Sequence, residues 1–493
     1  MRRATRRELV AAATATAMTA SVPPAWGRLL SRRVGVGPGR FRDGVASGEP
    51  GTRAVTFWSR LRTDRPRSGA RLIVATDPGL DDVVATTVVP TGRGIANTLK
   101  ARIGGLDPYT EYYYAWQSAS HVSEVGRTRT RPPDDAAVPL RIAFSSCQNY
   151  NRGYFSPHVH AAAEPLDLYM FLGDYIYERG RIVAAYDVRQ DHGNANDLRS
   201  YRRKYRLYRG DEGLRELHRV HPAVHIWDDH ELENNYSDNR PLPPAAAQRS
   251  AAYRAAFEWI PRVVYPRDRY RIYKSFRMGA HAELFLLDER QYRTGHGDGR
   301  ARRLLGDAQL RWLIDGLTRS TAQWKIVAQQ VSVARHPFGS GPAPDSWDGY
   351  AEERELLLGS IERAGIPNVV FLTGDAHVFS CNLLASDFEA LGDGSASTPA
   401  AVEYVGGSVT SPGTDRPEAD VQAKSPWNRQ YNGRDHGYAL LSIDGEKLVT
   451  EYRRSDLGSQ HGATEPFERF TQPAGGVNTV QRERLAPETP PPV

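Results

Sequence analysis

Four apolar stretches of strand length each run into a polar residue able to bind a metal, and this pattern constrains the fold more than any other feature. Stretches with helical periodicity lie between several of them; Leu310, Leu313 and Leu317, for example, recur at three- and four-residue spacing. Strands that alternate with helices indicate an α/β domain, and such sheets bind their ligands beyond the carboxyl ends of the strands. The four strands and their ligands are residues 140–144 with Cys147, 166–172 with Asp174, 223–227 with Asp229, and 369–373 with Asp375.

The part of the chain before this domain has shorter, alternating apolar runs. Ala54–Trp58 and Tyr112–Trp116 are rich in β-branched and aromatic residues, and turn residues separate such runs. Residues 41–131 are therefore predicted to form an all-β sandwich of the immunoglobulin or fibronectin type. We assign residues 138–455 to the α/β domain. Residues 456–493, whose last part is rich in proline and polar residues, are assigned to a C-terminal extension.

Residues 1–33 are predicted to be a twin-arginine export signal. Arg6 and Arg7 stand before a weakly apolar run, Leu9 to Val22, which is shorter than the ~20 apolar residues of a membrane-spanning helix. Such a signal would be read by the twin-arginine machinery, which exports folded proteins to the outside or to the cell envelope. The alternative is a disordered basic arm. No other segment is apolar enough to span a membrane.

The net charge of +6 lies in the same segment. Residues 1–33 contain seven arginines and one glutamate, which account for all of it, so the rest of the chain is formally neutral. We therefore expect no patch for binding nucleic acid or another polyanion.

The residues near Asp174 favour a particular kind of metal. Tyr177 follows Asp174 by three residues, so its phenol can reach an ion that the carboxylate binds. A phenol titrates near pH ~10, so only a strongly acidic cation keeps it ionised at neutral pH, and the same holds for the thiol of Cys147. Thiolate, phenolate and carboxylate together suit ferric iron better than magnesium or calcium. The alternatives are a core aromatic for Tyr177, a helix N-cap for Asp174, and a disulfide between Cys147 and Cys381.

Two further pairs, Asp229–His230 and Asp375–His377, supply oxygen and nitrogen ligands. An imidazole beside a metal-bound phosphate is a natural proton donor to a leaving alkoxide, and His230 can take that role unless it is a surface residue at a capped helix start. In an extended loop, positions one and three point the same way, so Asp375 and His377 are expected to share one metal site. Two cations would clamp the phosphate and activate a water, and the resulting hydroxide would attack phosphorus.

Together these blocks resemble the PhoD family of alkaline phosphatases and phosphodiesterases, which belongs to the calcineurin-like metallophosphatases. The resemblance covers the chain from Phe41 to about Arg453. It implies an α+β fold of four layers, in which helices flank two central sheets, preceded by a fibronectin-like domain. It is carried by Gly44–Pro50, Ser146–Gln148, Gly173–Glu178, Trp227–Glu231, Leu287–Arg293, Thr373–His377 and Val402–Ser408.

The resemblance also implies a site with Fe³⁺ and Ca²⁺. In this sequence the iron ligands would be Cys147, Asp174 and Tyr177, and the calcium ligands would be Asp174 as a bridge, Asp229, Asp375 and His377. His230 stands at the position of the catalytic proton donor.

Three residues are candidates for binding the substrate, namely Asn235, Arg290 and Arg293. Glu289 stands where the family pattern has a smaller residue, and its charge would alter substrate preference if it lined the pocket.

The predicted function is a secreted, metal-dependent phosphoesterase that acts on monoesters, diesters or both, with small phosphate esters or phospholipid head groups as substrates. A phospholipase D-like phosphodiesterase is an alternative within the same class. A catalytically inactive exported binding protein is an alternative from another class; it would have lost some ligand positions, and every ligand position of the pattern is present.

Overall fold

The computed structural model describes residues 35–180, 188–191, 193–237, 245–295, 301–335, 343–395, 398–475 and 479–486. The proposed export signal lies outside these residues. The chain forms two compact units. The first comprises Met1–Pro132, Leu214–Val224 and Ala255–Arg271, and the second comprises Pro133–Gly213, His225–Arg254 and Ile272–Val493.

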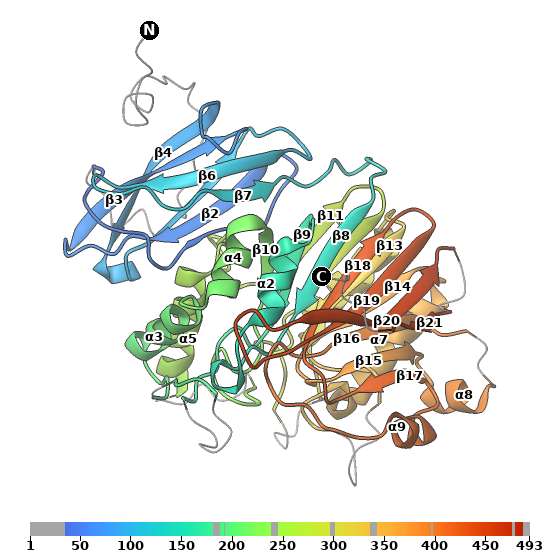
Figure 1. The fold of residues 1–493 in the computed structure, drawn as a ribbon. Helices are drawn as coiled ribbons and strands as arrows, with labels where there is room; N and C mark the ends of the chain where they lie inside the picture. The colour runs from blue at the N-terminus through green and yellow to red at the C-terminus, as the bar shows by residue number, and fades with distance from the viewer. Residues whose placement is uncertain are drawn as a thin grey trace. The chain divides into compact units, whose positions relative to one another are not determined.

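The N-terminal region of the first unit is all-β, as predicted (Figure 1). Side chains from both of its sheets meet in one core, where Phe57 of β2 packs edge-on against Tyr114 of β6 with ring centroids 4.8 Å apart. One sheet contains β1 (Val45–Gly48), β2 (Ala54–Arg60) and β5 (Thr98–Gly104). The other has the order β4 (Val83–Gly92), β3 (Arg67–Ala75), β6 (Glu111–Gln117) and β7 (Gly126–Arg129).

Two segments from the middle of the chain also belong to the first unit. They contain most of α4 (Glu212–Val220), the start of β10 (Pro222–Ile226) and the end of α5 (Ala245–Trp259). Ser47 of β1 pairs with Pro222 of β10 in parallel, and Trp58 Nε1 donates to the carbonyl of Glu258 at 2.9 Å. The sequence-based range 41–131 omits these segments because local periodicity does not reveal which remote segments pack together.

The second unit contains two mixed sheets. In the first sheet β8 and β9 are parallel, and in the second β12, β13, β14 and β16 are parallel. The order in the first is β21 (Gln481–Arg484), β20 (Thr464–Pro473), β19 (Lys447–Ser455), β18 (Gly437–Ile443), β8 (Leu140–Ser145) and β9 (Leu168–Leu172). The order in the second is β11 (Lys274–Met278), β12 (Ala282–Leu286), β13 (Trp324–Gln329), β14 (Val369–Thr373), β16 (Ala401–Gly406), β15 (Phe379–Leu384) and β17 (Asn428–Asn432).

The two sheets of this unit pack face to face, with helices outside them. The ring centroids of Phe379 (β15) and Tyr452 (β19) lie 5.0 Å apart, and those of Tyr404 (β16) and Phe470 (β20) lie 5.8 Å apart. Helix α2 (Ser156–Ala163) contacts β18, β19 and β20, while α6 (Gly306–Arg319) packs its Gly316 against Phe285 of β12. The predicted four-layer fold is therefore confirmed. Further helices of the unit are α3 (Leu198–Tyr208), the first part of α5, α7 (Ala351–Arg363), α8 (Phe388–Asp393) and α9 (Glu418–Lys424).

The range assigned to a C-terminal extension contains two strands of the first sheet. β20 pairs with β19 and β21 pairs with β20, both antiparallel. Phe467 and Phe470 are the large apolar residues that β20 buries, and its other buried side chains include Glu468 and Gln472. Because these polar residues are interspersed with the two rings, the composition of the segment does not indicate a core strand.

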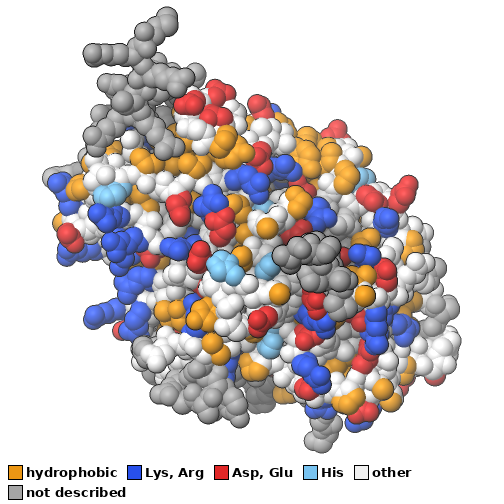
Figure 2. Space-filling model, in the orientation of Figure 1, with side chains coloured by type: hydrophobic (Ala, Val, Ile, Leu, Met, Phe, Trp, Pro, Cys, Tyr) orange, Lys and Arg blue, Asp and Glu red, His pale blue; other side chains and the backbone are white. Residues whose placement is uncertain are grey.

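Charged side chains of both signs occur together over the face of the molecule in Figure 2. Among the described residues, no helix is both long enough and apolar enough to cross a membrane.

Candidate metal centre

The predicted metal ligands converge in the second unit, where four strands end. Backbone hydrogen bonds join the loops that carry them: Cys147 N donates to Gly173 O at 3.2 Å, and Gln148 N donates to Asp174 O at 3.2 Å. Among the residues that the structure describes, three groups of side chains have ligand atoms that all lie within 4.8 Å of one another. They are Cys147, Asp174 and His377; Asp174, Asp229 and His230; and Asp228, Asp229 and Asp375.

The first group gains a phenol from Tyr177. Its Oη lies 2.9 Å from Asp174 Oδ2 and 3.4 Å from His377 Nε2, and it shares a 2.6 Å hydrogen bond with Ser411 Oγ. His377 Nδ1 lies 3.1 Å from the carbonyl of Pro412, to which it donates in the neutral tautomer. Burial lowers the pKa of His377 to about 4, so the ring is neutral and Nε2 presents its lone pair to this group.

The other two groups are linked to the first through shared carboxylates. Asp174 belongs to the first and second groups, and Asp229 belongs to the second and third. A carboxylate can bind one cation with each oxygen. Asp174 thus belongs to two neighbouring groups, which is the position that a bridging carboxylate requires.

Asp375 and His377 fall into different groups, whereas the sequence-based expectation puts them in one site. That expectation assumed an extended loop in which residues i and i+2 face the same way. The two residues have φ of 53° and 55°, which is left-handed and not extended backbone. The alternation rule does not apply to such a loop.

Left-handed backbone is concentrated at the candidate ligands. Cys147 and Asp174 have φ of 59° and 52°, like Asp375 and His377 in the loop after β14. A residue with a Cβ costs about 1–2 kcal/mol in this conformation, which persists only where the surrounding structure enforces it. The strain lies where four loops must aim side chains at the same small volume, which supports a functional site there.

Gly173 allows the β9 loop to approach the β10 loop. Its φ is +106°, and an added Cβ would lie 2.4 Å from the Cβ of Asp228. We expect Gly173→Ala to destabilise the fold by about 3 kcal/mol or more, because it combines backbone strain with an unavoidable overlap. Thermal unfolding and metal content are the measurements. Gly104→Ala is the control, since an added Cβ there meets no atom within 4 Å; equal behaviour of the two variants would contradict the prediction.

The electrostatics of the centre fit bound cations. Burial, with the charges of Asp174 and Asp375, raises the pKa of the Cys147 thiol, and burial also raises the pKa of Tyr177 and of Asp174. The pKa of Asp375 is raised to about 7 by burial and by Asp345. Asp228 Oδ2 and Asp229 Oδ1 are buried and accept no hydrogen bond from a described residue. Acids crowded in this way need nearby positive charge in order to ionise, and the donor set suits metal ions.

The three candidate substrate-binding residues contact these carboxylates. Arg290 is fully buried; its Nε donates to Asp228, Nη1 lies 2.9 Å from Asp345 Oδ1, and Nη2 lies 3.4 Å from Asp375 Oδ1. Arg293 Nη2 pairs with Asp345 Oδ1 at 2.8 Å. The backbone N–H of Asn235 donates to Asp229 Oδ2 at 2.7 Å. In this structure the three residues orient the acids of the centre.

Glu231 joins the loop after β9 to the loop after β10, and the sequence does not single it out. Its carboxylate accepts the backbone N–H groups of Asp174 at 3.1 Å, Tyr175 at 2.5 Å and Asp228 at 2.7 Å. It lies at the end of the Trp227–Glu231 block, but nothing in the local sequence indicates these distant partners. Sequence reasoning also missed Asp228, Glu178, Asp345 and Ser411 as neighbours of the ligands.

Two other expectations are resolved. Glu289 is fully buried and accepts hydrogen bonds from Val331 N at 2.8 Å and Trp347 Nε1 at 2.9 Å, so its carboxylate holds a loop and does not line a pocket. Cys147 and Cys381 are both free thiols, so the alternative disulfide is absent.

Comparison with known proteins gives matches over almost the whole chain. The family described as PhoD-like phosphatase matches residues 142–452, and the family described as PhoD-like phosphatase, N-terminal domain, matches residues 30–132. Alkaline phosphatase D of Bacillus subtilis (strain 168) is 34% identical over 463 residues, which cover 86% of this chain and 79% of the relative.

Solved structures agree with these matches. A structure of PhoD superposes with a TM-score of 0.83 at 31% identity and covers 91% of this chain and 92% of that one. The purple acid phosphatase PPD1 from yellow lupin (Lupinus luteus) seeds has a TM-score of 0.57 at 13% identity, with 87% of this chain and 73% of that one covered. At this identity the second likeness concerns the fold alone.

Proposed function

The chain belongs to the PhoD-like phosphatase family and is a phosphoric ester hydrolase, and on that basis we propose that it is an exported enzyme that uses Fe³⁺ and Ca²⁺ to hydrolyse phosphate monoesters and diesters. The observation that carries this proposal is the position of Asp174, whose carboxylate belongs both to a group with a thiol and to a group of carboxylates and imidazole. One side suits ferric iron and the other suits calcium.

The donor chemistry supports a division of the ligands. Cys147, Tyr177 and His377 would hold iron, with Asp174 as the shared ligand, and the oxygen-rich acids Asp229 and Asp375 would hold calcium. This division assigns His377 to iron, whereas the family resemblance alone assigns it to calcium. Bound cations of this kind supply a hydroxide at neutral pH and neutralise the phosphate oxygens.

His230 is arranged to donate a proton. Its Nδ1 donates to Glu178 Oε2 at 2.6 Å, and its ring stacks on Tyr177 with centroids 4.1 Å apart. This hydrogen bond fixes the ring, so Nε2 is the nitrogen left to protonate a leaving alkoxide. Burial alone would lower the pKa of His230, but Asp174, Asp229 and Glu178 outweigh it and raise the pKa to about 10.

Glu178→Gln is expected to make the rate more sensitive to the leaving group. Without the Glu178 charge the imidazole of His230 is a poorer proton donor. This matters for an alkoxide leaving group, which must be protonated, and hardly for nitrophenolate, which leaves without a proton. We expect kcat/KM for an alkyl phosphate to fall on the order of 10–100-fold, with a change of less than about threefold for p-nitrophenyl phosphate. Steady-state assays of both substrates measure this, with the surface variant Glu216→Gln as the control. An equal fall for both substrates would contradict the role of the pair.

Metal analysis beside ester assays tests the proposed function. Protein purified without added metal is expected to contain iron and calcium, and to hydrolyse both p-nitrophenyl phosphate and bis-p-nitrophenyl phosphate. Chelation of calcium should abolish turnover, and re-addition should restore it. Phosphatidylcholine vesicles test the phospholipase D-like alternative. Protein that contains neither metal, or that is inactive on all three substrates, would refute the proposal.

Export is proposed from residues 1–33. The twin-arginine machinery reads paired arginines, so Arg6→Lys with Arg7→Lys should retain the full-length protein inside the cell. Unchanged export of this variant, measured by fractionation, would contradict the assignment.

A further inference from the structure

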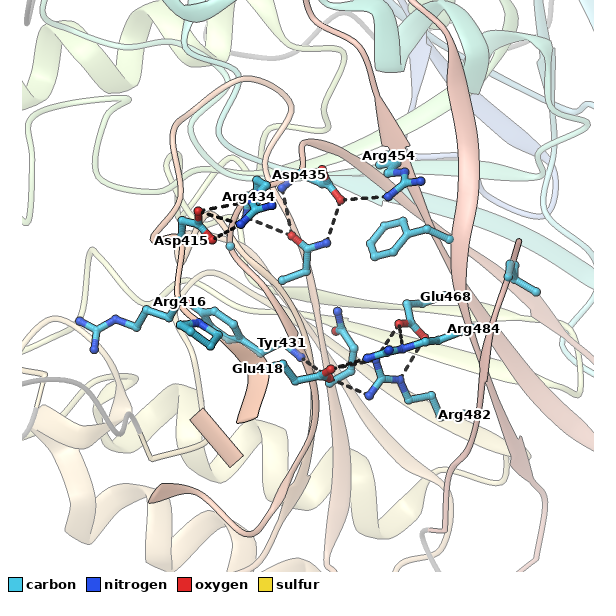
Figure 3. Close-up of a pocket in the computed structure, with 16 residues that line it drawn as sticks. Asp415, Arg416, Glu418, Tyr431, Arg434, Asp435, Arg454, Glu468, Arg482 and Arg484 are labelled. Carbon is cyan, nitrogen blue, oxygen red and sulfur yellow. Dashed lines mark hydrogen bonds and ion pairs between the residues drawn. The ribbon is translucent and has the colours of Figure 1, made fainter. Parts of the chain in front are cut away.

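The second unit also contains a cavity away from the metal ligands. It has a volume of about 720 Å³ and lies between the loop before α9, the end of β17 with the turn after it, and strands β20 and β21 (Figure 3). None of the metal ligands lines it. Five arginines and four carboxylates do, so the charged groups of its lining have a small positive excess.

The ion pairs of the cavity form two groups on opposite sides of it in Figure 3. On one side Arg482 lies 2.6 Å from both Glu418 and Glu468, and Arg484 lies 2.6 Å from Glu418. On the other side Arg434 contacts Asp415 at 3.1 Å, and Arg454 lies 3.6 Å from Asp435.

The arginines and their acids differ in exposure on one side of the cavity. Arg484 is 70% exposed, whereas its partners Glu418 and Glu468 are 20% and 6% exposed. On the other side Arg434 is 76% exposed and its partner Asp415 is 62% exposed. A molecule that enters on the Arg484 side therefore meets guanidinium more than carboxylate, and on the Arg434 side it meets both.

Arg434 and Asp415 form an exposed ion pair, which contributes little net stability, so Arg434 can turn to a ligand at small cost. When Arg484 turns away, its two acids keep Arg482 as a partner. Guanidinium binds phosphate with two parallel hydrogen bonds.

The cavity and the metal centre share one wall, the segment 411–418. At its start, Ser411 Oγ contacts Tyr177 Oη at 2.6 Å and the carbonyl of Pro412 contacts His377 Nδ1 at 3.1 Å. At its end, Asp415 and Glu418 line the cavity. Gly413 lies between the two, since an added Cβ would be 2.2 Å from His377 O and 2.5 Å from the carbonyl of Gly433, which lines the cavity. A single thickness of backbone thus separates the ligand loop from the cavity wall.

We propose that this cavity is a second anion site, which binds a phosphate group through Arg434 and Arg484. The bound group is either free phosphate or a distal phosphate of a substrate whose ester lies at the metal centre. The proposal goes beyond the hydrolysis described above, because no residue of the cavity takes part in that reaction.

Equilibrium dialysis of the metal-loaded, full-length protein with inorganic phosphate at low ionic strength tests the site. The wild type should bind two phosphates per chain. The double variant, Arg434→Gln with Arg484→Gln, should bind one, and its affinity for a second phosphate should be at least tenfold weaker than that of the wild type. Arg53→Gln with Arg319→Gln is the matched control, because these arginines are also exposed (58% and 73%) and paired with one acid each. Thermal unfolding checks that the variants are folded.

The possible results are distinguishable. Asp174→Ala, which removes the metal centre, should retain the cavity phosphate, and its combination with the two glutamine substitutions should retain none. If the wild type binds one phosphate and the double variant none, the cavity site stands and the proposed function is in doubt. If the wild type and the double variant bind the same number, the cavity proposal is overturned.

A second comparison identifies the source of the phosphate. For an ester that carries a second phosphate, the wild type should have a KM at least fivefold below that for p-nitrophenyl phosphate if the site holds the distal group, and the double variant should lose this advantage. Equal KM values together with the second phosphate equivalent would assign the site to free phosphate. If the wild type has no KM advantage and binds no second phosphate, the proposal is refuted.

Discussion

Asp174→Ala should release both kinds of cation and reduce phosphatase activity on the order of 10³-fold or more. The expectation follows from the membership of the Asp174 carboxylate in two ligand groups at once. Removing a ligand of one ion weakens the binding of that ion, whereas removing the bridging ligand weakens the binding of both. It also frees the backbone N–H of His230, which donates to Asp174 Oδ1 at 3.2 Å. Elemental analysis and ester assays on the same preparation measure the two effects together.

Asp167 supplies the control for this variant. It precedes β9, whereas Asp174 follows it, and it is also buried, at 7% exposure. Its carboxylate accepts the backbone N–H of Arg141 at 2.9 Å and takes part in no ligand group. Asp167→Ala should therefore lower stability while keeping the metals. Full iron and calcium content in Asp174→Ala would refute the bridging role.

Cys147→Ser should remove iron and reduce activity on the order of 10²-fold or more, because an alcohol does not ionise as a thiol does. If the thiolate and the Tyr177 phenolate both bind ferric iron, the wild-type protein is coloured and the variant is not. Calcium should remain, since the ligand group formed by Asp228, Asp229 and Asp375 does not include the cysteine. Absorption spectra and elemental analysis measure the change.

Cys381→Ser provides a matched comparison, because both cysteines are fully buried and free. Cys381 lies in β15 and belongs to no ligand group. Its variant should keep iron, colour and activity. Denatured, metal-free wild-type protein should contain two thiols, and a count of none would restore the disulfide. Iron retained in Cys147→Ser would place the metal on other ligands.

The geometry gives a reason why the centre combines such different ligands. The side chains of Cys147, Asp174 and His377 come from the loops after β8, β9 and β14 and lie close together. All three residues have left-handed backbone. Glu231 accepts backbone N–H groups of the loops after β9 and β10, and Arg290 pairs with Asp228 and Asp375 of the loops after β10 and β14. The two residues tie these three loops together. The loops are therefore kept in place by buried charges as well as by the cations that the site would bind.

Much of the fold and of the candidate site is readable in the sequence. A buried strand is a local run of apolar residues, and a candidate ligand lies among the first few residues beyond its carboxyl end. Cys147, Asp174, Asp229 and Asp375 can therefore be found without coordinates. The all-β N-terminal region follows from its alternating pattern in the same way. The family resemblance extends these local signals to the kinds of ion, which stay predictions.

Only the tertiary structure decided which of these groups act together. Asp375 and His377 separate because both residues have positive φ, and a backbone conformation of that kind is enforced by contacts that the local sequence does not contain. Ser411 beside Tyr177 and Glu231 beside Asp174 are separated from their partners by long stretches of chain. The strands and their polar ends depend on neighbouring residues, whereas the grouping of side chains depends on how remote loops pack, and for that reason the sequence determined the first and the folded structure the second.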